Sequence, residues 1–120
     1  FQLKRTFMKR ATKRPPSVKN VKVVIRTAGH KNMYRDIVAV KANNKIGKLR
    51  IFMHNKKELH AYGTMVDDKY QGLGLGTRLW ERAIKKYKPT YISVSTISEG
   101  GTRMINRLKS KHSQIDWDHW

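Results

Sequence analysis

Apolar and polar positions alternate along the first half of the chain, a period typical of strands that bury one face. Four such segments are predicted, at residues 21–27, 36–42, 46–52 and 59–66. Asn43-Asn44-Lys45 reads as a turn that joins the second and third segments in an antiparallel hairpin. Gly63 interrupts the fourth segment, which predicts a bulge or a close backbone approach there. Residues 28–35 leave room only for a loop or a single helical turn.

The period then changes to that of an amphipathic helix, predicted over residues 74–87 and ended by Lys88-Pro89. Its apolar stripe comprises Leu75, Leu79, Trp80, Ala83, Ile84 and Tyr87, while Arg78, Arg82, Lys85 and Lys86 remain in solvent.

A strand at 91–96 is expected to lie parallel to the 59–66 strand, and a second helix is expected over 102–111. The last nine residues either add a strand or pack Trp117 and Trp120 on the sheet. The predicted class is α/β: a mixed sheet with antiparallel front strands and one β-α-β unit, not a doubly wound sheet.

Charge narrows the function classes more than any other property of composition. The 120 residues contain 27 Lys and Arg against 8 Asp and Glu, a formal net charge of +19. Such an excess predicts a polyanionic partner (DNA, RNA or a ribonucleoprotein), although a generically basic protein is the alternative. Cysteine is absent, which excludes disulfides and thiolate metal sites or nucleophiles, and no metal site is predicted. No segment resembles a membrane span or a signal peptide, so we expect an intracellular setting (cytoplasm or nucleoid) or a virion, without secretion.

Residues 1–19 form a segment with paired basic residues and no acid. We interpret it as a flexible basic arm before a single domain at residues 20–120. The arm residues predicted to contact nucleic acid are Lys4, Arg5, Lys9, Arg10, Lys13 and Arg14. A solvated tail without a binding role is the alternative.

The glycine-rich stretch between the fourth strand and the first long helix, residues 71–76, predicts a phosphate-binding loop. Amides at a helix start have no intrahelical partner, and the helix dipole favours an anion there. The P-loop pattern fails because no Lys precedes Thr77. The dinucleotide pattern fails because antiparallel strands precede the loop and no acid follows about 20 residues later.

Gln71, Gly74 and Gly76 have the spacing of the coenzyme A loop of GNAT N-acetyltransferases: Arg or Gln, two residues, Gly, one residue, then Gly or Ala. Residues 36–96 as a whole resemble that family. The resemblance implies the GNAT fold and acetyl-CoA as cosubstrate. The residues it assigns to the cosubstrate are Met65 and Val66, beside the pantetheine, and Gln71, Gly72, Leu73, Gly74, Leu75, Gly76 and Thr77, at the pyrophosphate. The alternative is that the glycines only make a tight turn.

The resemblance also implies where catalysis would occur. The Val66 amide matches the family's usual oxyanion donor, and the family's base lies on the strand before the loop. His60 and Glu58 are nearest to that place, with Tyr62 on the same face as His60. His60 is equally readable as an outward polar residue, and Glu58 as a turn charge.

The chain departs from the family at the general acid, the residue that protonates the leaving thiolate. Arg107 stands near the position of the family's Tyr, which leaves Ser98 as the nearby hydroxyl before the helix. The family's acceptor-lining helices are reduced to a stub at 28–35, and an open acceptor face suits a bulky acceptor. We therefore expect an acetyl-CoA-dependent N-acyltransferase acting on an amine of a protein or nucleic acid. The alternative is a catalytically inactive GNAT fold that serves as a basic nucleic-acid-binding or structural component.

Overall fold

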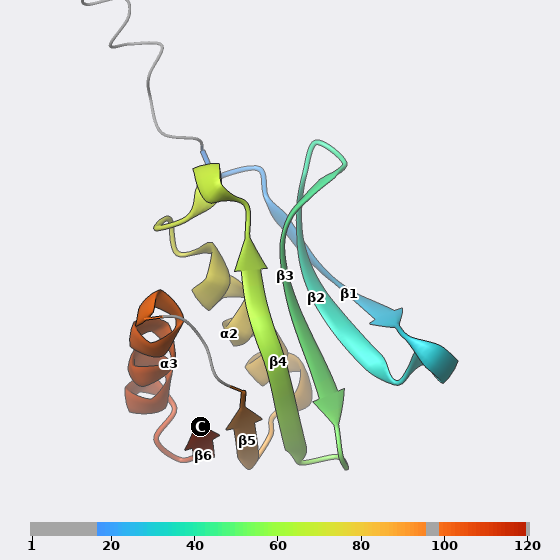
Figure 1. Ribbon diagram of the computed structural model, residues 1–120, viewed down its shortest axis with the longest axis vertical. Coiled ribbons are helices and arrows are strands. Elements are labelled where there is room, and N and C mark those ends of the chain that lie inside the picture. Colours follow the sequence, from blue (N-terminus) through green and yellow to red (C-terminus); the bar gives the residue numbers. More distant parts are fainter. Residues whose placement is uncertain (1–16, 96–98, 120) are drawn as a thin grey trace, which may run out of the picture.

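A computed structural model describes residues 17–95 and 99–119, which form one six-stranded sheet in the order β1-β2-β3-β4-β5-β6 (Figure 1). The strands are β1 (Lys22–Ala28), β2 (Tyr34–Lys41), β3 (Asn44–Met53), β4 (Glu58–Val66), β5 (Tyr91–Val94) and β6 (Asp116–His119). Two α-helices, α2 (Leu75–Tyr87) and α3 (Glu99–Lys111), and two short 3₁₀ turns, η1 (His30–Asn32) and η2 (Asp68–Tyr70), complete the fold. No described helix combines the length and apolarity needed to span a membrane.

The pairing confirms the predicted fold class. Strands β1 to β4 pair antiparallel, and β5 joins β4 in parallel after the α2 crossover. The predicted bulge is present: the β3–β4 register shifts between the Arg50–Gly63 and Ile51–Ala61 pairs. Of the two expectations for the tail, the added strand is observed, with β6 parallel to β5.

Helix boundaries differ from the prediction mainly in α3, which begins at Glu99 rather than at residue 102. Glycines have low helix propensity, so Gly100 and Gly101 argued for a break, whereas the structure includes both in the first turn. Strand β5 ends at Val94, two residues before the predicted end. The Ser95 amide still donates to the Ala61 carbonyl at 3.2 Å, and beyond this bond β4 has no partner on its β5 side among the described residues.

One apolar core lies between the sheet and the two helices. Leu79, Trp80 and Ala83 of α2 are fully buried there, together with Ile105 and Leu108 of α3. The two helices are also joined at the surface, where Glu81 of α2 accepts hydrogen bonds from Lys111 and pairs with His112. These core and surface contacts fix the position of α3 relative to α2.

The opposite face of β2, β3 and β4 carries no helix (Figure 1), because the β1–β2 connection has five residues and contains only the short turn η1. Asp36 of β2 lies on this face and accepts two hydrogen bonds from Arg50, at 2.8 and 2.9 Å. Aromatic rings continue the surface toward the start of β4: Tyr34, Phe52, His54, His60 and Tyr62 pack edge to face. We call this surface the open face.

Candidate functional site

A cleft of about 780 Å³ lies where the end of β4, the start of α2 and one side of α3 converge. This volume is in the range of small-molecule sites in proteins. The lining residues predicted from the sequence are Val66, Gln71, Gly72, Gly74, Gly76 and Thr77. Gly63, Thr64, Tyr70, Trp80, Val94, Gly101, Arg103, Met104, Ile105 and Arg107 complete the lining.

The cleft exists because β4 and β5 separate. Their pairing covers only Glu58–Ala61 of β4 against Tyr91–Val94 of β5, and the bulge at Gly63 follows directly. The second half of β4 therefore has β3 on one side and the cleft on the other.

The direction of the backbone groups at the end of β4 follows from strand alternation. The Asp67 amide donates to Ile46 at the start of β3, at 2.9 Å. Because successive residues of a strand point their N–H and C=O groups to opposite sides, Met65 also faces β3, while Thr64 and Val66 face the cleft. The Val66 amide is thus placed to donate to a ligand. The Met65 side chain is 70% exposed on the open face, and Met65 does not line the cleft.

The glycine loop has the backbone form of an anion site. Gly72 and Gly74 have φ angles of 77° and 80°, in the left-handed region that favours glycine. A Cβ added to either would meet no protein atom within 4 Å, so both face open space rather than packing. Gly74 precedes the first turn of α2, and the amides of that turn have no carbonyl partner within the helix. A phosphate group fits this arrangement of amides and helix dipole.

The other loop residues hold the loop in place. The Gln71 side chain donates to the Val66 carbonyl at 3.1 Å and to Asp68 Oδ1 at 3.2 Å, which closes the turn from β4 into α2. Leu75 is buried in the core, and Leu73 packs against its edge. The side chains of both leucines therefore anchor the loop, and only their backbone can serve a ligand.

The α3 wall of the cleft was not predicted as a binding element. Arg103 and Arg107 lie one helical turn apart, are both exposed, and line the cleft opposite the glycine loop. No acidic residue lines the cleft in the part of the chain that the structure describes. The sequence signal that could have indicated this wall is the pair of arginines four residues apart on a predicted helix, which places them on one side of it. Arg107 stands near the position of the family's Tyr, and its guanidinium offers N–H donors instead of a hydroxyl.

His60 lies on the open face, next to the point where β4 and β5 separate. Its Nδ1 atom is 2.6 Å from Ser93 Oγ, and its Nε2 atom is 3.1 Å from Ser95 Oγ. Desolvation by burial, and then the nearby His54, lower the pKa of His60 below its usual 6.5. A neutral imidazole suits two hydroxyl partners, since one nitrogen accepts and the other donates. The Tyr62 ring packs edge to face on His60, with centroids 4.6 Å apart.

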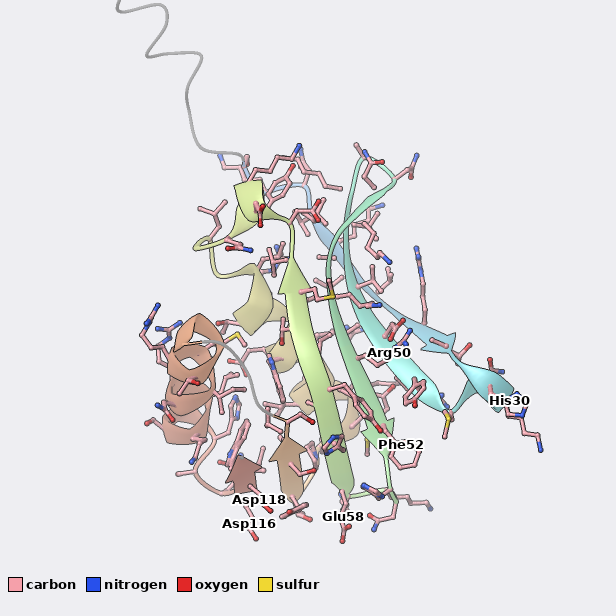
Figure 2. All side chains as sticks on the ribbon, viewed as in Figure 1. His30, Arg50, Phe52, Glu58, Asp116 and Asp118 are labelled. Atoms are coloured by element: carbon pink, nitrogen blue, oxygen red, sulfur yellow. The ribbon has the colours of Figure 1, made fainter. Side chains whose placement is uncertain are left out.

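Glu58, another predicted catalytic residue, does not lie at this point. Glu58 is exposed at the start of β4, five residues before the bulge at Gly63, or about 16 Å along the strand. Figure 2 shows Glu58 at the end of the sheet that also carries Asp116 and Asp118. Ser98 and the arm residues Lys4, Arg5, Lys9, Arg10, Lys13 and Arg14 lie outside the described residues.

Comparison with known proteins places this geometry in a family. The sequence model of the acetyltransferase (GNAT) family matches residues 6–107. No curated protein matches the chain in sequence.

Several solved structures share the fold. A GNAT family acetyltransferase from Elizabethkingia anophelis with acetyl-CoA bound is 15% identical, with a TM-score of 0.58 over 77% of this chain and 75% of its own. A GNAT family acetyltransferase from Streptococcus pneumoniae is 12% identical, with a TM-score of 0.63 over 77% and 91%. The ribosomal-protein-S18-alanine N-acetyltransferase from Escherichia coli is 12% identical, with a TM-score of 0.59 over 72% and 76%.

The splayed strands, the inward Val66 amide and the open glycine loop fit the cosubstrate of this family. With the family match over residues 6–107, the conclusion is that the chain belongs to the GNAT acetyltransferases, whose cosubstrate is acetyl-CoA.

Proposed function

We propose that this chain transfers the acetyl group of acetyl-CoA to an amine of a macromolecular acceptor that docks on the open face. The observation that carries the proposal is the absence of a helix over β2, β3 and β4 in the described chain. Met33, Tyr62 and Met65 are the exposed large apolar side chains of that part of the chain, at 47%, 45% and 70%. Tyr62 and Met65 flank the bulge that opens into the cleft. An open surface with exposed apolar side chains beside a cleft suits an extended or bulky acceptor more than a small molecule.

The proposed base is His60, assisted by Ser95. Acetyl-CoA supplies a thioester; the amine nitrogen forms the new C–N bond as the C–S bond breaks and the thiolate leaves. The acceptor ammonium must first lose a proton. Ser95 follows Val94, a residue of the cleft lining, and its hydroxyl lies 3.1 Å from His60 Nε2. The serine can pass the acceptor's proton to the imidazole, whose neutral form is favoured by burial.

The test measures acetyl-CoA-dependent thiol release with three acceptors: a lysine-rich peptide, a polyamine and tRNA. Turnover with the peptide or tRNA that exceeds turnover with the polyamine supports a macromolecular acceptor. Acetyl-CoA binding without turnover on any acceptor would favour the inactive GNAT fold instead.

A matched pair of variants locates the acceptor surface. Tyr62→Ser should raise the KM for the acceptor and leave the affinity for acetyl-CoA unchanged, because Tyr62 is exposed on the open face and does not line the cleft. Tyr87→Ser is the control, with the lysine-rich peptide as acceptor, since Tyr87 lies on the far side of the sheet beside β1. An equal change in both variants would refute docking on the open face.

A further inference from the structure

A second concave surface lies between β1, the edge strand of the sheet, and the last turns of α2. It has a volume of about 480 Å³, and the cationic side chains on its side of the sheet are those of Arg35, Arg82 and Lys86. Tyr87 and Thr27 also line it, above a floor of partly buried β1 side chains that includes Val23 and Ile25. We call this surface the β1–α2 groove.

The groove continues as a positive stripe along α2. Arg78, Arg82 and Lys86 are spaced four residues apart, so they follow one side of the helix over about 12 Å. All three are exposed. The Arg78 guanidinium donates to the carbonyls of Val18 at 3.4 Å and Val21 at 3.2 Å. These bonds tie the segment that follows the basic residues 1–16 to the upper end of the same stripe.

No carboxylate among the described residues neutralises the groove. None lines it. Asp36 lies on the open face, across the sheet from the groove, where it accepts two hydrogen bonds from Arg50. Glu81 of α2 is turned to α3, where Lys111 and His112 bind it. The groove therefore retains its positive potential.

From this arrangement we infer that the β1–α2 groove binds a nucleic-acid strand through its phosphates. Guanidinium groups match phosphate oxygens in geometry as well as charge. The partly buried ring of Tyr87 lines the groove and offers a base a stacking surface, which a single strand can use and a duplex cannot. An acidic protein would match the charge but would gain nothing from this combination of an aromatic ring and guanidinium groups.

The groove is separate from the acetyl-CoA cleft. Helix α2 meets the cleft through Gly76, Thr77 and Trp80 and meets the groove through Arg82, Lys86 and Tyr87. The inference therefore does not rest on the proposed catalysis. Both ligands can be held at once.

The experiment uses the full chain and a fluorescein-labelled 20-nucleotide single strand of RNA, with binding followed by anisotropy across a range of salt concentrations. The test variant is Arg82→Gln/Lys86→Gln. The control, Lys56→Gln/Lys57→Gln, removes the same charge from the exposed β3–β4 turn. Thermal unfolding and acetyl-CoA titration confirm that each variant is folded.

Neutralising the two groove cations should weaken binding about tenfold or more at low salt. It should also reduce the slope of log K against log salt by about 1.4, the value for two lost phosphate contacts to a single strand. The control should stay within about twofold of the native affinity, with its slope unchanged. Equal losses in both variants would mean that overall charge, not the groove, binds the strand. No loss in the groove variant, no binding by the native chain, or equally strong competition by polyglutamate would each overturn the inference.

Discussion

Gly74 tests whether the glycine loop binds acetyl-CoA or only makes a turn. Its φ of 80° and ψ of 9° lie in the left-handed region, at the N-cap of α2. In Gly74→Ala the methyl group would meet no protein atom within 4 Å, so it would stand in the open mouth of the cleft. The substitution therefore strains the backbone and obstructs the ligand without disturbing any packing.

The two effects have separate magnitudes. A left-handed Ala costs about 1–2 kcal/mol of unfolding free energy. For a chain of this size, each kcal/mol lost lowers Tm by about 3–6 °C. Loss of one amide hydrogen bond to a charged phosphate costs about 1.5–3 kcal/mol. That loss corresponds to an acetyl-CoA affinity about ten- to a hundred-fold weaker.

Gly29→Ala is the matched control for backbone strain. Gly29 has a φ of 79°, and an added Cβ would lie 2.5 Å from the Tyr34 ring, far from the cleft. We expect it to lose about 3 kcal/mol or more of stability and to bind acetyl-CoA normally. The assays are thermal unfolding and calorimetric titration with acetyl-CoA at a temperature where both variants are folded. If Gly74→Ala lowers Tm but binds acetyl-CoA as the native chain does, the loop is a turn and the phosphate assignment is wrong.

Three further predictions concern charged and titratable groups. His60→Gln should lower kcat/KM by about 10²–10⁴-fold without changing acetyl-CoA affinity. Because the pKa of His60 is lowered, the kcat/KM of the native chain should fall only below about pH 6.5. If the variant has the same pH–rate profile as the native chain, His60 is not the base. The hydrogen bonds from Arg50 lower the pKa of Asp36 below 3.8, so their contribution to stability is present above about pH 4 and is lost as the pH falls through the folded value. Urea unfolding between pH 2 and 6 should therefore show a steeper acid loss in the native chain than in Arg50→Gln, and equal slopes would contradict this. Replacing Arg103 and Arg107 with Ala should weaken acetyl-CoA more than its 3′-dephospho analogue, measured by calorimetry, and equal weakening would show that the arginines do not bind that phosphate.

Local periodicity was sufficient to predict most elements, because each strand and the α2 helix carry their own apolar pattern. The glycine loop was also predictable, since its chemistry depends on backbone conformation at Gly72 and Gly74, which the residue type itself favours. The parallel pairing of β5 with β4 followed from the single helix between them. All of these rest on residues close together in the chain.

The side-chain environment of the site was not predictable in the same way. His60 was identified, but its partners Ser93 and Ser95 lie 33 and 35 residues away and meet it only through the β4–β5 register. Arg103 and Arg107 line the cleft because α3 packs against α2, and that contact involves Gly76, where an added Cβ would come within 3.0 Å of Met104. Neither arrangement is visible in a local pattern, because each depends on tertiary packing.

The two anion sites inferred on α2 bind anions through different groups, and the salt dependence of binding should therefore distinguish them. At the glycine loop the donors are backbone amides and a helix dipole beside a partly enclosed cleft. In the β1–α2 groove the donors are exposed side chains, whose attraction for a polyanion depends on counterion release and is screened by salt. Raising salt from about 50 to 200 mM should therefore weaken nucleic-acid binding much more than acetyl-CoA binding. Parallel losses would indicate instead that the exposed Arg103 and Arg107, not the backbone loop, dominate acetyl-CoA binding.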